Sequence, residues 1–196
     1  GTTTSEDKRE SLLQLGVQAH HWELSNQLSE SSCEFLNDLE ILILNIPPSK
    51  VKSELSYSIL LQKFGGYLSE KTKVIFISTT SVYPETIQEA SEDYKWTNLD
   101  LQKETVQAEI KLRAILGSQL TILRLAGLIG NDRHPVKYLS GKKEIPNGNS
   151  PVNLIHLDDV IGIVEQIIDR NYWGEILNAC YPNHPTKKLY YTQMAQ

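Results

Sequence analysis

The sequence has 196 residues, of which 40% are hydrophobic and 22% charged, as expected for a globular protein long enough to bury a core. Its formal net charge of −5, scattered Lys and Arg residues and lack of a long apolar run predict no nucleic-acid or membrane partner. Cys33 and Cys180 are too few for a disulfide scaffold or a zinc site, and no export signal begins the chain, so we expect a cytoplasmic protein.

The first predicted helix begins after Ser5, whose hydroxyl can accept a hydrogen bond from a free N–H group. Glu6 and Asp7 follow, and their negative charges favour the positive end of the helix dipole. Gly16 is expected to end the helix. The helix is expected to turn its leucines inward: Leu12, Leu13 and Leu15.

Two further segments lead to the first buried strand. Residues 17–23 predict a short strand, and residues 24–37 are polar and weakly helical. Residues 39–45 are almost wholly apolar, which is typical of a strand covered on both faces in a parallel sheet. A helix is then expected to begin at Pro47-Pro48-Ser49 and to end at Gly65-Gly66. Its apolar residues recur at helical spacing: Val51, Leu55, Ile59, Leu60 and Phe64.

The strand and helix pattern then repeats. Residues 74–77 and 120–125 predict buried strands, and a helix over residues 99–116 ends at Gly117 between them. After Gly130 the pattern loosens. We therefore expect an α/β fold with a domain over residues 1–130 and a smaller lobe over residues 131–196, interleaved with the end of the sheet.

The smaller lobe has its own predicted elements. Residues 152–156 predict a strand, and Asp158 is expected to cap a helix that carries regularly spaced valines and isoleucines. Residues 175–179 and 186–195 predict a last strand and a last helix. His156, Asp158 and Asp159 look like metal ligands, but the acids fit helix capping, so no metal is predicted.

Small, hydroxyl and proline residues follow three of the predicted strands. The segments are Asn45-Ile46-Pro47-Pro48, residues 78–83 and Leu125-Ala126-Gly127. Each alone is as typical of an ordinary helix start or strand end as it is of a ligand site. In an open parallel sheet, however, ligands bind beyond the carboxyl ends of the strands. Their recurrence at successive strand ends therefore favours one shared ligand site.

Four segments resemble one family of proteins when they are taken in order. They are ISTTSVY (residues 77–83), RLAGLIG (124–130), NDRHPVKYLSGK (131–142) and NLIHLDDV (153–160). This set resembles the extended short-chain dehydrogenase/reductase superfamily, which includes the NAD-dependent epimerases and dehydratases, and especially its YeeZ-like bacterial branch. The resemblance implies a Rossmann-type doubly wound parallel sheet with a small C-terminal substrate lobe.

The same resemblance implies a function. It implies an NAD(P)-binding oxidoreductase or epimerase that acts on a small polar substrate held between the sheet and the lobe. Members of the superfamily often form homodimers, so a homodimer is the assembly that the resemblance favours. The fold alone does not certify an activity.

One departure from the family concerns the phosphate-binding turn. The family begins with a strand and a Gly-x-Gly-x-x-Gly turn, yet none of the 11 glycines makes that pattern after a strand. The opening residues resemble instead the end of the family's second strand. A sheet without its central strand would expose two apolar edges. We therefore expect that the first strand and its glycine-rich turn are missing from this chain and belong to a longer protein.

A second departure concerns catalysis. The family pairs a Ser or Thr with Tyr-x-x-x-Lys, in which the tyrosine moves a proton and the lysine lowers its pKa. By resemblance Thr79 fills the hydroxyl position. The helix that should carry the pair has Leu101 and Thr105 at the two positions, so the pair is absent from that helix. Tyr83 is the nearest phenol, and Thr79 and Tyr83 are the predicted catalytic residues.

The opening residues bear on the choice of cofactor. NAD enzymes commonly place an acid at the end of the second strand, where this chain has hydroxyls instead. Hydroxyls at a helix N-terminus, with Lys8 and Arg9 nearby, suit the 2′-phosphate of NADP, which is favoured over NAD. The predicted cofactor contacts are Thr2, Thr3, Thr4, Ser5, Asn45, Ile46, Pro47, Ser78, Ala126 and Gly127.

The predicted substrate contacts lie near the start of the smaller lobe and are Arg133, His134 and Asn153. For Arg133 and His134, contact with an anionic substrate and simple exposure to solvent are equally good readings. Two other functions stay open. One is a non-catalytic NAD(P)-sensing or interaction protein, which loss of the Tyr and Lys pair would permit. The other is a flavodoxin-like or phosphate-binding α/β domain.

Overall fold

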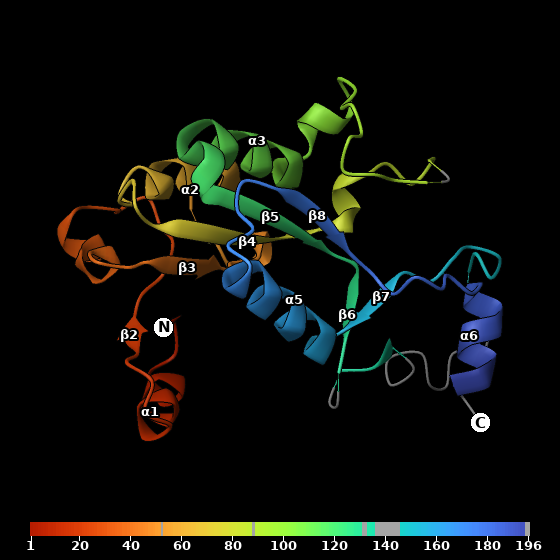
Figure 1. Cartoon of the computed structure of the whole chain (residues 1–196), viewed down its shortest axis with the longest axis horizontal. Coiled ribbons are helices and arrows are strands. Elements are labelled where there is room, and N and C mark those ends of the chain that lie inside the picture. Colours follow the sequence, from red (N-terminus) through yellow and green to blue (C-terminus); the bar gives the residue numbers. More distant parts are fainter. Residues whose placement is uncertain (52, 88, 131–132, 136–145, 195–196) are drawn as a thin grey trace. The chain divides into compact units, whose positions relative to one another are not determined.

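The computed structural model describes residues 1–51, 53–87, 89–130, 133–135 and 146–194 (Figure 1). The chain forms two compact units, each made of two segments. The first unit comprises Gly1–Val74 and Trp96–Leu120, and the second comprises Ile75–Lys95 and Thr121–Gln196. Within the described ranges, no helix combines the length and the apolar character needed to cross a membrane. The expected boundary near residue 130 remains a prediction.

The first unit contains most of the helices that precede residue 121. Short strands β1 (Thr2–Thr3) and β2 (His20–His21) pair in parallel, with Thr2 opposite His20. The other elements are α1 (Glu6–Gln14), η1 (Ser31–Leu36), β3 (Ile41–Leu44), η2 (Pro48–Lys50), α2 (Tyr57–Gly65), η4 (Asp100–Gln102), α3 (Glu104–Leu116) and η5 (Gly117–Gln119).

Helix α1 confirms the predicted cap but not the predicted buried face. The Ser5 side chain accepts a hydrogen bond from the Lys8 backbone N–H at 3.4 Å, and Gly16 follows the helix with φ of 78°. Leu13 and Leu15 are 44% and 78% exposed, so the expectation that they face inward is wrong. The helix packs on the two-residue strands β1 and β2, which offer too little apolar surface to cover them.

The second predicted helix begins later than expected. Pro48 opens only the short η2, and α2 begins at Tyr57 after the extended residue Ser56. Helix α2 packs against α3, and a Cβ on Gly65 would stand 3.6 Å from a methyl group of Leu112, an ordinary van der Waals distance. The two helices bury a shared apolar face that includes Leu60, Leu61, Phe64, Val106, Leu112 and Leu116.

The main sheet has the strand order β3-β4-β5-β8. Strands β4 (Lys73–Thr79) and β5 (Leu120–Leu125) each begin in the first unit and continue into the second, which also holds β8 (Ile176–Ala179). β5 and β8 are parallel, with Leu125 opposite Ala179. The arrows of β4, β5 and β8 run in the same direction in Figure 1. The predicted α/β fold with parallel strands is confirmed, although Ile43 of β3 is 50% exposed and not covered as expected.

The second unit builds its core where α5 (Leu157–Asp169) packs on the sheet. Buried side chains of four elements form this core: Ile75, Leu123, Val160, Ile167 and Ala179. Beyond β5, the strands β6 (Gly127–Ile129) and β7 (Leu154–His156) pair in parallel, and α6 (Lys187–Met194) lies near the end of the chain. The short η3 (Thr80–Val82) follows β4.

The cap of α5 differs from the prediction. His156, not Asp158, is the N-cap residue, and its Nδ1 accepts a hydrogen bond from the Asp158 backbone N–H at 3.2 Å. Asp158 and Asp159 lie in the first turn, where their charges favour the helix dipole. The predicted cap was therefore wrong by two residues because a histidine ring nitrogen takes the place of a carboxylate.

Candidate functional site

The carboxyl end of β4 is shaped by a hydroxyl cap. Thr79 is the last residue of the strand, and its Oγ1 accepts a hydrogen bond from the Ser81 backbone N–H at 3.2 Å. The same hydroxyl donates to Ser81 Oγ at 3.2 Å. Ser78 and Thr79 are half-buried, so their side chains stay within reach of solvent at the strand end.

The neighbouring strand β5 ends in a close backbone approach. The Ala126 N–H donates to the Ala179 carbonyl at 3.0 Å, and the Gly127 N–H donates to the Asn153 carbonyl at 3.0 Å. A Cβ on Gly127 would stand 2.9 Å from Leu154 Cδ2 and 3.1 Å from the Asn153 carbonyl oxygen. The glycine is therefore explained by packing against β7, and its predicted contact with a cofactor stays a prediction.

Tyr83 follows η3 and is buried, with 7% of its surface exposed. Its hydroxyl lies 2.9 Å from two acceptors, the Ser91 carbonyl and Asn178 Oδ1. The Asn178 backbone N–H in turn donates to a carboxylate oxygen of Glu92 at 2.7 Å. Tyr83 thus links the segment after β4 to strand β8, and a role in proton transfer would require its hydroxyl to exchange one of these partners.

Arg124 is the residue of this site that sequence reasoning missed. It is 1% exposed, and its Nη1 donates to the Tyr83 hydroxyl at 2.6 Å. The guanidinium carbon lies 5.1 Å from the centre of the Tyr83 ring, within the range of a cation–π contact. A signal was present in the sequence, because an arginine inside the buried strand of residues 120–125 must find partners there.

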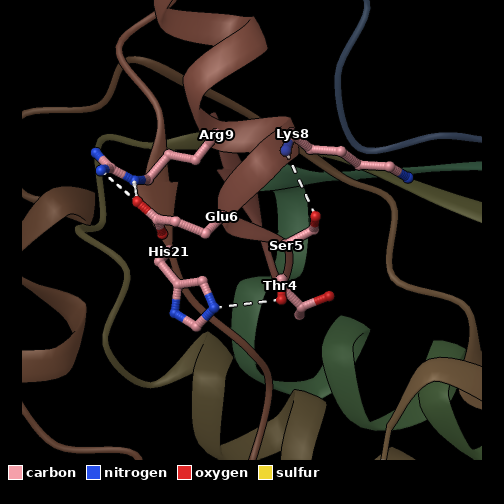
Figure 2. Close-up of polar contacts among 6 residues, drawn as sticks. All are labelled: Thr4, Ser5, Glu6, Lys8, Arg9 and His21. Atoms are coloured by element: carbon pink, nitrogen blue, oxygen red, sulfur yellow. Dashed lines mark hydrogen bonds and ion pairs between the residues drawn. The ribbon is translucent and has the colours of Figure 1, made fainter.

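The predicted cofactor-binding residues at the start of the chain surround the N-terminus of α1 (Figure 2). The Thr3 hydroxyl accepts from the Ser5 backbone N–H at 3.2 Å, and Ser5 caps the helix, so both are already engaged. The exposed Thr4 presents its carbonyl to His21 Nε2 at 3.2 Å. The hydroxyl cluster fits a polar ligand at this helix end, with Thr4 the more accessible side chain.

The two cations beside this cluster differ in availability. Arg9 forms an ion pair with Glu6, and its Nε also donates to Glu6 Oε1 at 2.6 Å. The hydrogen bond from Arg9 lowers the pKa of the Glu6 carboxyl, and both groups are exposed. In the part of the chain that the structure describes, the Lys8 ammonium has neither a hydrogen bond nor an ion pair. Figure 2 shows it extending away from Glu6. Lys8 is therefore the cation that fits a phosphate.

The predicted contacts after β3 belong to the first unit. Asn45 and Pro47 are exposed, and the Ile46 carbonyl accepts a hydrogen bond from the Tyr57 hydroxyl at 2.7 Å. Burial raises the pKa of this phenol. Thr79 and Ala126 belong to the second unit, so the convergence of all three strand ends on one cleft remains a prediction.

The predicted substrate contacts lie on two sides of the β6 and β7 pair. Arg133 is exposed, and its backbone pairs with that of Gly130. His134 Nε2 lies 3.0 Å from the Tyr190 hydroxyl, and the two rings are stacked. Asn153 has an exposed side chain on the residue that precedes β7. Residues 136–142 of the motif quoted above lie outside the described residues.

The spacing Tyr-x-x-x-Lys does occur elsewhere in the sequence. Tyr67 and Lys71 follow α2, but the Tyr67 hydroxyl donates to the Leu28 carbonyl at 3.1 Å, and the pair does not lie on α3. Tyr138 and Lys142 have the same spacing and lie outside the described residues. The position in the helix, rather than the spacing alone, is what the family pattern requires.

Comparison with solved structures places this fold. The chain is similar to a conserved protein from Silicibacter pomeroyi, with a TM-score of 0.69 and 21% identity over 100% of this chain and 68% of that one. It is also similar to UDP-glucuronic acid 4-epimerase from Bacillus cereus, solved with NAD (TM-score 0.63, 17% identity, 92% of this chain and 67% of that one). A third similar structure is dTDP-glucose 4,6-dehydratase from Bacillus anthracis, solved with NAD (0.65, 14%, 97% and 67%). The fold is the Rossmann-type fold of NAD-dependent epimerases and dehydratases.

Sequence comparison identifies a more specific relative than the structural comparison does. The chain is 31% identical over 204 residues to protein YeeZ from Escherichia coli K12, a match that covers 100% of this chain and 73% of YeeZ. No family model matches the sequence. The chain belongs to the YeeZ family.

Proposed function

We propose that the protein binds NADP or NAD at the carboxyl ends of its parallel strands and acts as an oxidoreductase or epimerase on a small polar substrate. One observation carries this proposal. The neighbouring strands β4 and β5 end, respectively, in the hydroxyl pair Ser78 and Thr79 and just before Ala126. Strand ends of this kind form the nucleotide site in open parallel sheets.

The residues of this chain would share the work in the following way. The nicotinamide cofactor, when bound, supplies or accepts the hydride. Thr79 would turn its hydroxyl from Ser81 to the substrate oxygen and orient it. Tyr83 is the proposed proton carrier, and Arg124, which donates a hydrogen bond to its hydroxyl, would hold that hydroxyl in position.

The choice of NADP over NAD rests on Lys8. An ammonium in the first turn of α1 would pair with the 2′-phosphate that NAD lacks. An exposed pair of this kind contributes about 1 kcal/mol or less, or a factor of about five in affinity. Arg9 contributes less because Glu6 already neutralises it.

A binding experiment tests the cofactor and its preference. Calorimetric titration of the full chain with NADPH and NADH should show binding of both, tighter for NADPH. Lys8→Ala should reduce the affinity for NADPH about fivefold and leave that for NADH unchanged. Arg9→Ala is the matched control and should change the ratio of the NADPH affinity to the NADH affinity less than Lys8→Ala does. Absence of binding by either nucleotide contradicts the proposed site.

A turnover experiment then tests the reaction. NADPH oxidation with a panel of sugars, aldehydes and ketones should identify a substrate, and Thr79→Ala should lower kcat about a hundredfold, as for loss of an oriented hydroxyl. Thr79→Ser should retain most of the activity because it keeps the hydroxyl. Equal activity of the wild type and Thr79→Ala would remove Thr79 from the mechanism.

A second function is a non-catalytic sensor in which a bound nucleotide alters a partner surface. It is favoured by Leu101 and Thr105 at the positions of the family's Tyr and Lys, and by the burial of Tyr83. Tight NADPH binding without turnover of any compound in the panel supports the sensor. Thermal protection by a flavin nucleotide, and not by NADPH or NADH, would instead indicate a flavodoxin-like domain.

A further inference from the structure

A small apolar pocket lies in the second unit beside the paired strands β6 and β7. Its volume is about 290 Å³. Its lining includes apolar side chains of both strands, of the segment before β7 and of the segment after β8: Ile129, Val152, Leu154, Ile155 and Pro185. A cavity of about 150 Å³ with similar lining holds benzene, so this pocket has room for one ring and a short chain.

His156 supplies a hydrogen-bond donor to the wall of this pocket. Its Nδ1 accepts from the Asp158 backbone N–H, so the neutral ring carries its hydrogen on Nε2. When the ring is protonated, Nδ1 faces the Asp158 carboxylate at 3.5 Å, and Nε2 again carries a hydrogen. In either state Nε2 is a donor, and it has no partner among the described residues.

Tyr190 adds a second polar group to the lining. Its hydroxyl is held by His134 Nε2 at 3.0 Å, and its ring is stacked on that of His134. Burial, and to a smaller extent Tyr191, raises the pKa of the Tyr190 phenol, which therefore stays protonated near neutral pH. Asp159, Tyr181 and Asn183 also belong to the lining. A few polar groups in a mostly apolar hollow are the usual composition of a small-molecule site.

The pocket is close to the proposed cofactor site along the chain. Ile129 follows Ala126 by three residues, and a fully extended chain covers about 10 Å over that length. Ala126 is part of the strand end at which we place the cofactor. That strand end therefore lies within about 10 Å of Ile129, a lining residue of the pocket.

We propose that this pocket binds the apolar part of the substrate, an aromatic ring or branched alkyl group attached to a small carbonyl or alcohol. The substrate is then polar at the reacting carbon and apolar in the remainder. This inference rests on the proposed function for the reaction itself, and it adds the class of substrate. The pocket, however, is tested by binding alone.

The first test measures binding without any cofactor. The full chain is titrated with benzyl alcohol and, separately, with glycerol, by calorimetry and by ligand-observed NMR. Benzyl alcohol should bind saturably and glycerol should not. Asn183→Trp places a large side chain on an exposed residue of the rim and should weaken benzyl alcohol about tenfold. Asn149→Trp, on an exposed residue outside the lining, is the matched control and should leave the affinity unchanged.

The second test examines the polar groups. Tyr190→Phe should weaken benzyl alcohol about threefold to tenfold, as for loss of one hydrogen bond. It should leave the affinity for toluene, which has no hydroxyl, unchanged. A structural role of Tyr190 alone would weaken both probes equally.

The outcomes separate this inference from the proposed function. Benzyl alcohol binding that Asn183→Trp reduces supports the pocket, even if NADPH and NADH do not bind and the proposed function fails. Lack of saturable binding, or binding that Asn183→Trp does not change, overturns the pocket, even if NADPH binds with high affinity.

Discussion

The pair formed by Arg124 and Tyr83 provides a stringent test of how the second unit is held together. Arg124→Met keeps the aliphatic volume of the side chain and removes the guanidinium. It therefore removes the 2.6 Å hydrogen bond to the Tyr83 hydroxyl and the cation–π contact. A hydrogen bond to a charged group contributes about 1.5–3 kcal/mol, and a desolvated cation–π contact about 1–2 kcal/mol.

We expect Arg124→Met to lower the free energy of unfolding by about 2–4 kcal/mol, because the buried Tyr83 loses one of its partners. Tyr83→Phe should lower it by about 1–3 kcal/mol, since Asn178 and Ser91 lose a donor as well. The double variant should be less destabilised than the sum of the two by about 1–2 kcal/mol. Arg170→Met, on an exposed arginine after α5, is the control and should change stability by less than about 0.5 kcal/mol.

Urea unfolding followed by far-ultraviolet circular dichroism measures these changes, provided that the slope of the free energy against urea stays constant. Strictly additive effects in the double variant would refute the coupling. A neutral or stabilising Arg124→Met would show that the cost of burying the guanidinium exceeds its interactions, as occurs for some buried ion pairs.

Four further predictions follow from local geometry and burial. Gly127→Ala should destabilise the protein by about 1–2 kcal/mol, because another atom already lies 2.9 Å from the Cβ position. In the described part of the chain nothing lies within 4 Å of that position at Gly162, so Gly162→Ala should stabilise α5 by about 0.5–1 kcal/mol; thermal unfolding measures both. Iodoacetamide at pH 8 should modify the exposed Cys180 well before the buried Cys33, because burial raises the pKa of the Cys33 thiol; peptide mass spectrometry reads the order, and equal rates would contradict it. Burial raises the pKa of Tyr57, so the stability it contributes is present below the unfolded value of about 10 and is lost as the pH rises above it. Tyr57→Phe should therefore lose stability less steeply over that range in chemical unfolding, and an identical slope would show that Tyr57 does not titrate with unfolding.

Sequence patterns predicted the elements whose signals are local. The cap at Ser5, the end of α3 at Gly117 and strand β5 all lie where the sequence placed them. Capping needs only the residues of one turn, and a buried strand needs only a run of apolar side chains. The segments that resemble the family are likewise short stretches of neighbouring residues, so the resemblance could be recognised from the sequence without the structure.

The same patterns failed where an outcome depends on a distant partner. Leu13 and Leu15 have the spacing of a buried face, but whether they are covered depends on what packs against α1. His156 replaces Asp158 as the cap of α5 because its ring nitrogen lies within hydrogen-bond distance of the Asp158 N–H. Apolar periodicity predicts that a helix has an apolar face, but it does not predict which other element packs against that face.

The sequence by itself determined the alternation of strands and helices and the hydroxyl-rich ends of the strands. Both features depend only on residues that are close together in the sequence. Tertiary structure alone decided the pairing of Arg124 with Tyr83, 41 positions apart, and the meeting of β7 with the segment after β8 around an apolar pocket. The physical reason is that a charge in the interior is tolerated only next to its partner, and that partner is chosen by strand pairing rather than by sequence distance.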